Sequence, residues 1–165
     1  MINIKKRSIL ITLSALIIIA IDQTIKSLVI FNLSKPINLI NGFLNLTYVQ
    51  NKGGAFGIGQ SSIITFIVVN IVVLGIIVKF MISQINAMDK KTMVSLTLIL
   101  AGGIGNFLDR IYRGFVVDYL DITQLVNNYP IFNFADICIV VGWILLAIAI
   151  LITVKKTPKS KAKKE

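Results

Sequence analysis

Long apolar stretches separated by short polar segments dominate the sequence. A helix needs about 20 mainly apolar residues to cross the hydrocarbon core of a bilayer, and each of these stretches approaches that length. They cover residues 8–30, 63–82, 93–108 and 137–154, of which the third is the shortest and is rich in glycine. The pattern predicts a mainly α membrane protein with four transmembrane helices.

The segment between the first two apolar stretches has a different pattern. Residues 37–59 contain alternating apolar side chains at Leu44, Leu46 and Tyr48, together with many glycines and asparagines. Such alternation predicts short strands and turns, and hence a small β element outside the bilayer. Residues 116–122, VVDYLDI, are rich enough in β-branched and aromatic side chains to join it, although they can also extend the preceding helix.

The first apolar stretch follows three basic residues, as the apolar part of a secretory signal peptide does. However, it continues past Asp22 to Ile30 and is not followed by a small-residue cleavage site, which favours a retained helix. The sequence shows no internal repeat and no soluble domain. We therefore expect one integral membrane domain, residues 1–154, followed by a basic cytoplasmic tail, residues 155–165.

The composition supports a bilayer location and predicts an orientation. The chain is 56% hydrophobic, has a mean hydropathy of +0.86 and carries a formal net charge of +10. Its basic residues form blocks beside the apolar stretches, at residues 5–7, 79–91 and 155–164, without the interleaved aromatic side chains of a nucleic-acid interface. By the positive-inside rule these blocks are cytoplasmic. Both termini are then inside, residues 31–62 and 111–136 are outside, and the tail can attract anionic membrane lipid.

Histidine is absent from the sequence, and cysteine occurs once. Without histidine the chain lacks the usual base of serine and cysteine hydrolases and the commonest zinc ligand. Cys138 cannot form an internal disulfide, and its place at the start of an apolar stretch favours a packing role. Aspartate is therefore the residue type left for chemistry.

Two polar groups interrupt the apolar stretches. Asp22 and Lys26 lie four residues apart on one helical face, with the acid N-terminal to the base, which predicts a self-neutralising structural pair. Near the end of the third stretch, AGGIGNFLDR places Asn106 and Arg110 on a shared face, and its glycines allow a second backbone to approach closely. Asp109 is expected either to form a solvated ion pair at the interface or to help Asn106 and Arg110 build the wall of a site.

Two further aspartates fall at the outer side of the predicted bilayer. Asp118 follows the third stretch and Asp136 lies just before the fourth, and the chain between them must turn back, so it is free to bring the two carboxylates together. Two carboxylates that share a site do not both ionise easily, so one can act as a base on water while the other donates a proton. The pair favours amide hydrolysis without a metal, and Asn133 can orient the acid or the substrate carbonyl.

Five segments make the sequence similar to the lipoprotein signal peptidases, also called signal peptidase II. They are DQTIK, NKGGAFG, GGIGNFLDR, VVDYLD and FNFAD, and they occur in the family's order at residues 22–26, 51–57, 102–110, 116–121 and 132–136. The length and the four-helix pattern also agree with the family. Gly54 is a departure, because the family usually has alanine there, and we expect a more flexible loop with unchanged chemistry.

The resemblance implies a bacterial inner-membrane aspartic endopeptidase with Asp118 and Asp136 as its catalytic dyad. Such an enzyme removes the signal peptide from a prolipoprotein just before a cysteine that carries a diacylglyceryl group, and it needs no cofactor or metal. The resemblance also implies that four residues line the substrate site: Asn51, Asn106, Arg110 and Asn133. Asp22 and Lys26 then serve as structural support.

Three other functions are compatible with the same residues. A small proton- or cation-conducting transporter can use acids inside the membrane, among which Asp22 is the candidate. A membrane phosphotransferase can hold a divalent metal on Asp118 and Asp121, with Asp109 as the nearest third acid. A purely structural scaffold would tolerate asparagine at positions 118 and 136.

Overall fold

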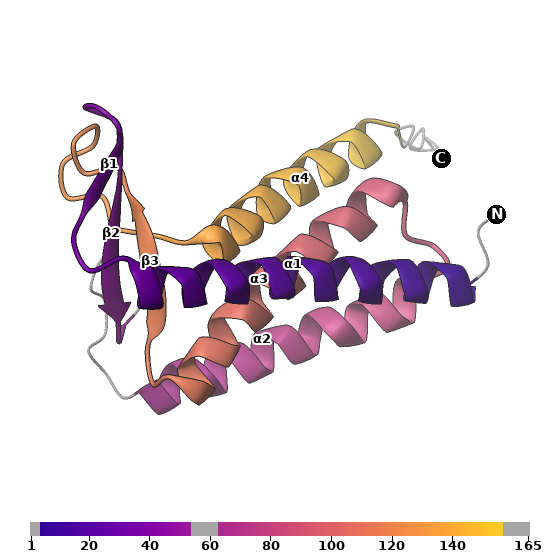
Figure 1. The fold of residues 1–165 in the computed structure, drawn as a ribbon. Helices are drawn as coiled ribbons and strands as arrows, with labels where there is room; N and C mark the ends of the chain where they lie inside the picture. The colour runs from indigo at the N-terminus through magenta and orange to yellow at the C-terminus, as the bar shows by residue number, and fades with distance from the viewer. Residues whose placement is uncertain (1–3, 54–62, 157–165) are drawn as a thin grey trace, which may run out of the picture.

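The computed structural model describes residues 4–53 and 63–156, with side chains to residue 153, and Figure 1 shows its fold. Gly54 and residues 157–165 of the basic tail therefore lie outside the described residues. The described chain forms, in order, α1 (Ile4–Asn32), β1 (Ile37–Ile40), β2 (Leu44–Asn51), α2 (Ile63–Gln84), α3 (Lys90–Tyr112), β3 (Val116–Asp121) and α4 (Phe134–Lys156). Its four helices are long and apolar enough to cross a membrane, and its strands form a small sheet, so the predicted fold class is confirmed.

Helix α3 lies at the centre of the bundle and packs against α1, α2 and α4 (Figure 1). In an apolar stretch of 18 residues within α3, 61% of the residues are buried, whereas only 6% are buried in the corresponding stretch of α2. Many of the side chains that α1, α2 and α4 leave exposed are large and apolar, as at Leu16, Ile76 and Leu151. Apolar side chains that face outward are typical of helices surrounded by lipid.

Helix α3 is longer than the predicted stretch 93–108 at both of its ends. It begins after Asp89, whose side chain caps the helix by accepting a hydrogen bond from the backbone N–H of Thr92 at 2.8 Å. It ends at Tyr112, and Gly114 then adopts a left-handed conformation with φ of 77°. This turn starts β3, so the strand interpretation of residues 116–122 is confirmed and the helical extension is wrong.

The sheet has the order β1-β2-β3 and is antiparallel throughout. It lies at one end of the bundle, and the start of α1 and the end of α4 lie at the other (Figure 1). Strand β3 follows α3 directly and pairs with β2, which places Val49 opposite Asp118. A bridge between Leu120 and Phe132 brings the start of α4 back to β3. The sheet therefore holds the segments that carry Asp118 and Asp136 side by side.

The buried side chains form two apolar clusters with a polar layer between them. One cluster joins α2 and α3 away from the sheet, and the other lies beneath the sheet around Val29, Val117 and Tyr119. Between them the helices bury charged side chains, among them Lys26 and Asp109, each 0% exposed. Burying such groups is costly unless they are paired and hydrogen-bonded. Charged side chains inside a helical membrane bundle therefore indicate a structural or functional polar site.

Helices α3 and α4 approach closely at Gly102. A Cβ atom added there would lie 2.4 Å from the carbonyl oxygen of Ala135 and 2.9 Å from Cγ1 of Ile139. The predicted role of the glycines in close packing is confirmed at this position. Cys138 is buried in the same region of α4, as expected for a packing residue.

Candidate active site

A cavity of about 310 Å³ opens where the sheet meets α3 and α4. Its lining consists of Asn51, Asn106, Arg110, Val116, Asp118, Tyr129, Pro130, Ile131, Phe132, Asp136, Ile139 and Val140. Asn133, the remaining residue expected at the substrate site, is fully buried directly behind this lining. Residues that are far apart in the sequence thus meet at one cavity.

Asn133 joins the two aspartates. Its side-chain Nδ2 donates to Oδ1 of Asp118 at 2.6 Å, and its backbone N–H donates to Oδ2 of Asp136 at 3.1 Å. The Oδ1 atom of Asn133 in turn accepts a hydrogen bond from the backbone N–H of Asp136 at 3.0 Å. This reciprocal pair caps the first turn of α4, in the manner of a capping box. The same residue therefore sets the start of α4 and holds both carboxylates at the cavity.

The other oxygen of each carboxylate also accepts a hydrogen bond from an asparagine. Asn51 donates to Oδ2 of Asp118 at 2.8 Å, and Asn106 donates to Oδ1 of Asp136 at 2.8 Å. Asn51 is itself fixed because its Oδ1 accepts from the backbone N–H of Gly53 at 2.9 Å. Both carboxylates are thus held in defined orientations by neutral donors.

The surroundings of Asp118 favour its protonated form. Burial is the largest cause, and with the neighbouring charge of Asp136 it raises the pKa of Asp118 to about 6, against the opposing hydrogen bonds from Asn51 and Asn133. Two nearby carboxylates titrate as a pair, and the first proton that the pair binds is shared between them. A pair of this kind can supply one acid and one base at a pH near 6.

Arg110 provides a positive charge at the rim of the cavity. Its Nη1 donates to the backbone carbonyl of Asn106 at 3.1 Å, and its Nη2 lies 3.4 Å from the carbonyl of Gly53. The guanidinium also lies over the ring of Phe66 at 5.3 Å. These contacts link α3 to the end of β2 and to α2, and they leave Arg110 within the cavity lining.

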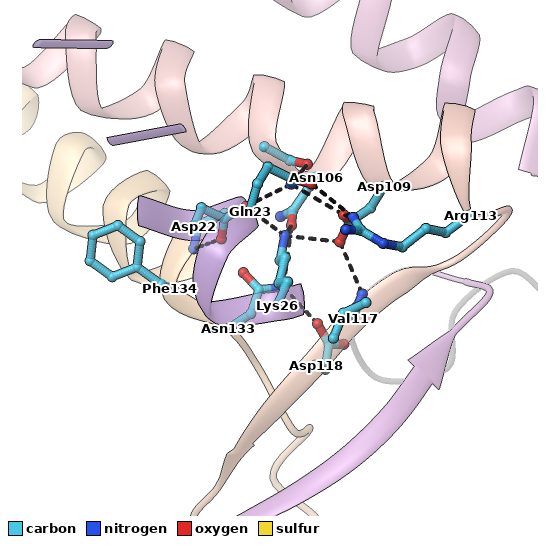
Figure 2. A network of polar contacts seen from close by, with 12 residues as sticks. Asp22, Gln23, Lys26, Asn106, Asp109, Arg113, Val117, Asp118, Asn133 and Phe134 are labelled. Atoms are coloured by element: carbon cyan, nitrogen blue, oxygen red, sulfur yellow. Dashed lines mark hydrogen bonds and ion pairs between the residues drawn. The ribbon is translucent and has the colours of Figure 1, made fainter. Parts of the chain in front are cut away.

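A buried ionic cluster is hydrogen-bonded to Asn106 of the cavity lining, and Figure 2 shows its network of contacts. The ammonium of Lys26 is 2.9 Å from Asp22 and 3.0 Å from Asp109, so the predicted pair of Asp22 and Lys26 is confirmed and has a third member. Arg113 forms a second ion pair with Asp109. The ion pair expected between Asp109 and an arginine therefore forms, but Asp109 is fully buried instead of solvated, and it faces Lys26 and Arg113 instead of the cavity.

Asp121 has a different environment from Asp118, although both belong to β3. Its carboxylate accepts hydrogen bonds from Thr123 Oγ1 at 2.6 Å and from Thr47 Oγ1 at 2.9 Å. Burial alone would raise the pKa of Asp121, but the hydrogen bonds from Thr123 and Thr47 lower it. Residues three apart in a strand point to opposite faces, so Asp118 and Asp121 do not form the proposed metal site. Across residues 4–53 and 63–156, no group of three or more acidic, histidine or cysteine side chains is arranged to hold a metal.

The sequence did not predict the apolar part of the cavity lining. Tyr129 and Phe132 meet edge to face, with ring centroids 6.0 Å apart, in the connection that leads to α4. Ile139 and Val140 extend this apolar lining along the first turns of α4. Pro130 and the aromatic residues just before Asp136 were the available signal, because they place a rigid apolar segment next to a candidate acid.

The fold and cavity define a class, the multi-pass membrane proteins that present paired carboxylates at one end of a helical bundle. The family model described as signal peptidase (SPase) II matches residues 14–152. The chain therefore belongs to the signal peptidase II family, which makes it a membrane peptidase that acts on lipoprotein precursors.

Two similar solved structures agree with this assignment. One is a bacterial membrane enzyme determined by the in meso method at 2.3 Å resolution, with 33% identity, a TM-score of 0.80 and coverage of 94% of each chain. The other is a bacterial membrane enzyme determined by the same method at 1.9 Å resolution, with 35% identity and a TM-score of 0.76. That match covers 91% of this chain and 94% of the other.

Proposed function

We propose that the protein is an aspartic endopeptidase whose catalytic dyad is Asp118 and Asp136. The observation that carries the proposal is the bridge through Asn133, which bonds both carboxylates at the edge of one cavity. The raised pKa of Asp118 supports a pair that holds one proton near neutral pH. Asp22, the residue behind the transporter alternative, is engaged by Lys26 and by the backbone N–H of Ala135 instead.

The proposed reaction uses a water molecule between the two carboxylates. The ionised carboxylate takes a proton from this water, whose oxygen attacks the scissile carbonyl carbon, while the protonated partner gives its proton to the carbonyl oxygen. In the resulting tetrahedral intermediate the carboxylate that gained the proton transfers it to the amide nitrogen. The C–N bond then breaks, a hydroxyl proton returns to the other carboxylate, and the dyad again holds one proton.

The proposed scissile bond lies just before a cysteine that carries a diacylglyceryl group. The apolar lining from Tyr129 to Phe132 and on α4 supports binding of an acylated segment, because apolar surface buried against acyl chains is favourable. The polar lining residues Asn51, Asn106 and Arg110 offer donors to the substrate backbone, and Asn133 positions the dyad behind them.

We further propose a bacterial inner-membrane location with the cavity at the outer face and both termini in the cytoplasm. Arg7 donates to the carbonyl oxygens of Ile85 and Met88, which ties the basic start of α1 to the connection between α2 and α3. The basic blocks at residues 5–7 and 90–91 therefore share the end opposite the sheet, as the positive-inside rule requires.

The lipid requirement has a direct test. Purified protein is expected to cleave a synthetic prolipoprotein signal peptide whose cysteine carries diacylglycerol, and to leave the same peptide with a free cysteine uncut, because the lipid holds the bond at the membrane surface. Mass spectrometry should show a product that begins at the lipidated cysteine. Equal cleavage of both peptides, or cleavage at another bond, would contradict the proposed substrate.

The pH dependence of kcat/KM tests the proton held by the dyad. A carboxyl whose folded-state pKa is raised to about 6 loses its proton as the pH rises through that value, so activity is expected to fall on the alkaline side. Asn51→Ala removes a hydrogen bond that lowers the pKa of Asp118, and should therefore move this alkaline limb to higher pH. Asn38→Ala is the matched control, because Asn38 bonds only its exposed strand partner Asn45 among the described side chains. An unmoved limb in Asn51→Ala would refute the assignment to Asp118.

A further inference from the structure

Lys26 is the buried cation directly behind the dyad, and it bonds to a residue of the cavity as well as to its acidic partners. Its ammonium has three protons and three acceptors, namely Asp22, Asp109 and, at 2.9 Å, Oδ1 of Asn106. The side chain is 0% exposed, so it does not touch substrate in the cavity. Figure 2 shows this ammonium within the network that ends at Asp118.

The contact with Lys26 fixes the orientation of the Asn106 amide. Its Oδ1 accepts from Lys26 and from Nδ2 of Asn133, the latter at 3.2 Å, while its Nδ2 donates to Asp136 at 2.8 Å. A flipped amide would place its NH2 group against the ammonium and its oxygen against the carboxylate of Asp136. Both new contacts would be repulsive. The charge on Lys26 thus ensures that Asn106 presents a donor to Asp136.

The acidic partners of Lys26 hold the backbone beside each catalytic residue. Oδ1 of Asp22 accepts the backbone N–H of Ala135 at 3.1 Å, and Oδ2 of Asp109 accepts the backbone N–H of Val117 at 3.1 Å. Ala135 immediately precedes Asp136, and Val117 immediately precedes Asp118. One ammonium is therefore linked, through a carboxylate on either side, to the chain positions of both dyad members.

We propose that Lys26 is a positioning residue of the peptidase, which fixes the Asn106 amide and the spacing of the two catalytic carboxylates. This inference rests on the proposed dyad. Its charge also acts directly, since it lowers the pKa of Asp118. Among the described residues, the titratable and charged groups around this point are Asp22 and Lys26 on α1, Asp109 and Arg110 on α3, Arg113 just after it, Asp118 and Tyr119 on β3, and Asp136 and Cys138 on α4.

The test compares full-length Lys26→Met, alone and combined with Asp22→Asn, with the wild-type protein. The double variant removes both members of one ion pair, so it avoids a buried carboxylate without its cation, and asparagine at 22 still offers an oxygen to Ala135. The expected result is a loss of kcat of about tenfold or more with a smaller change in KM. The alkaline limb of kcat/KM should also move up by about one pH unit, because a cation that favours ionised carboxylates has been removed.

Arg113→Gln is the matched control, because it removes the other cation of the cluster. Arg113 bonds to Asp109, Gln23 and Ser27. Its loss should lower the melting temperature and leave the pH profile in place. If the folded Lys26 variants keep the wild-type profile as well, or if neither of them folds, Lys26 acts only in stability and the proposal is overturned. Asp118→Asn in the same assay tests the dyad separately from the role of Lys26, because activity in this variant would overturn the dyad itself.

Discussion

Asparagine in place of either Asp118 or Asp136 should lower kcat by about a thousandfold, because one of the two proposed proton-transfer groups is lost. The change keeps size and shape, so KM for the lipidated peptide should change little. Both carboxylates accept hydrogen bonds from N–H donors at each oxygen, and an amide nitrogen at one of these positions would face a donor. Each variant should therefore also lose about 1–3 kcal/mol of stability while staying folded. Initial rates and thermal melting of the purified variants measure both effects.

Asp121→Asn is the control for this experiment. It makes the same chemical change in the same strand, but its carboxylate bonds to Thr47 and Thr123 instead of facing the cavity. It should retain cleavage close to the wild-type rate. Wild-type turnover in both Asp118→Asn and Asp136→Asn would rule out the dyad and would favour the scaffold.

Gly102→Ala should reduce both stability and activity. The added methyl group would lie 2.4 Å from the carbonyl oxygen of Ala135, which belongs to the backbone and cannot rotate away. Overpacking of this kind costs about 1–3 kcal/mol, and the shift needed to relieve it displaces the first turn of α4, which carries Asp136. Melting temperature, and kcat at a temperature where the variant is folded, are the two measurements.

Gly75→Ala provides the opposite case in α2. A Cβ atom added at Gly75 has no other heavy atom within 4 Å among the described residues, so the change is free of clashes. Because alanine is a better helix former, the variant should keep full activity and gain up to about 1 kcal/mol. If Gly102→Ala behaved like Gly75→Ala, the close approach of α3 and α4 would not position Asp136.

The sequence predicted the helices through their apolar content, but not their ends. Hydropathy falls where Asp109 and Arg110 begin, whereas the helix continues to Tyr112 because its backbone hydrogen bonds do not depend on apolar side chains. The end is set by Gly114, whose left-handed conformation only the folded chain shows. The same turn decided between strand and helix for residues 116–122, which composition alone had left open.

The site residues were identified from their types and from a family resemblance, and their geometry came only from the structure. Spacing in the sequence does not show that Asn133 bonds to both Asp118 and Asp136, because these contacts depend on how α4 meets the sheet. Asp109 was misplaced for a similar reason. A nearby arginine suggested a solvated ion pair, whereas Asp109 is buried because it also pairs with Lys26 on α1, as well as with Arg113 just after the end of α3.

The position of Asn133 at the junction of α4 and β3 has a consequence for biogenesis. Helix α4 is the last to leave the ribosome, and until it docks, Asp118 has no second carboxylate at its side. With the proposed dyad, a copy whose α4 has not yet docked lacks the catalytic pair and is expected to leave neighbouring proteins in the bilayer uncut.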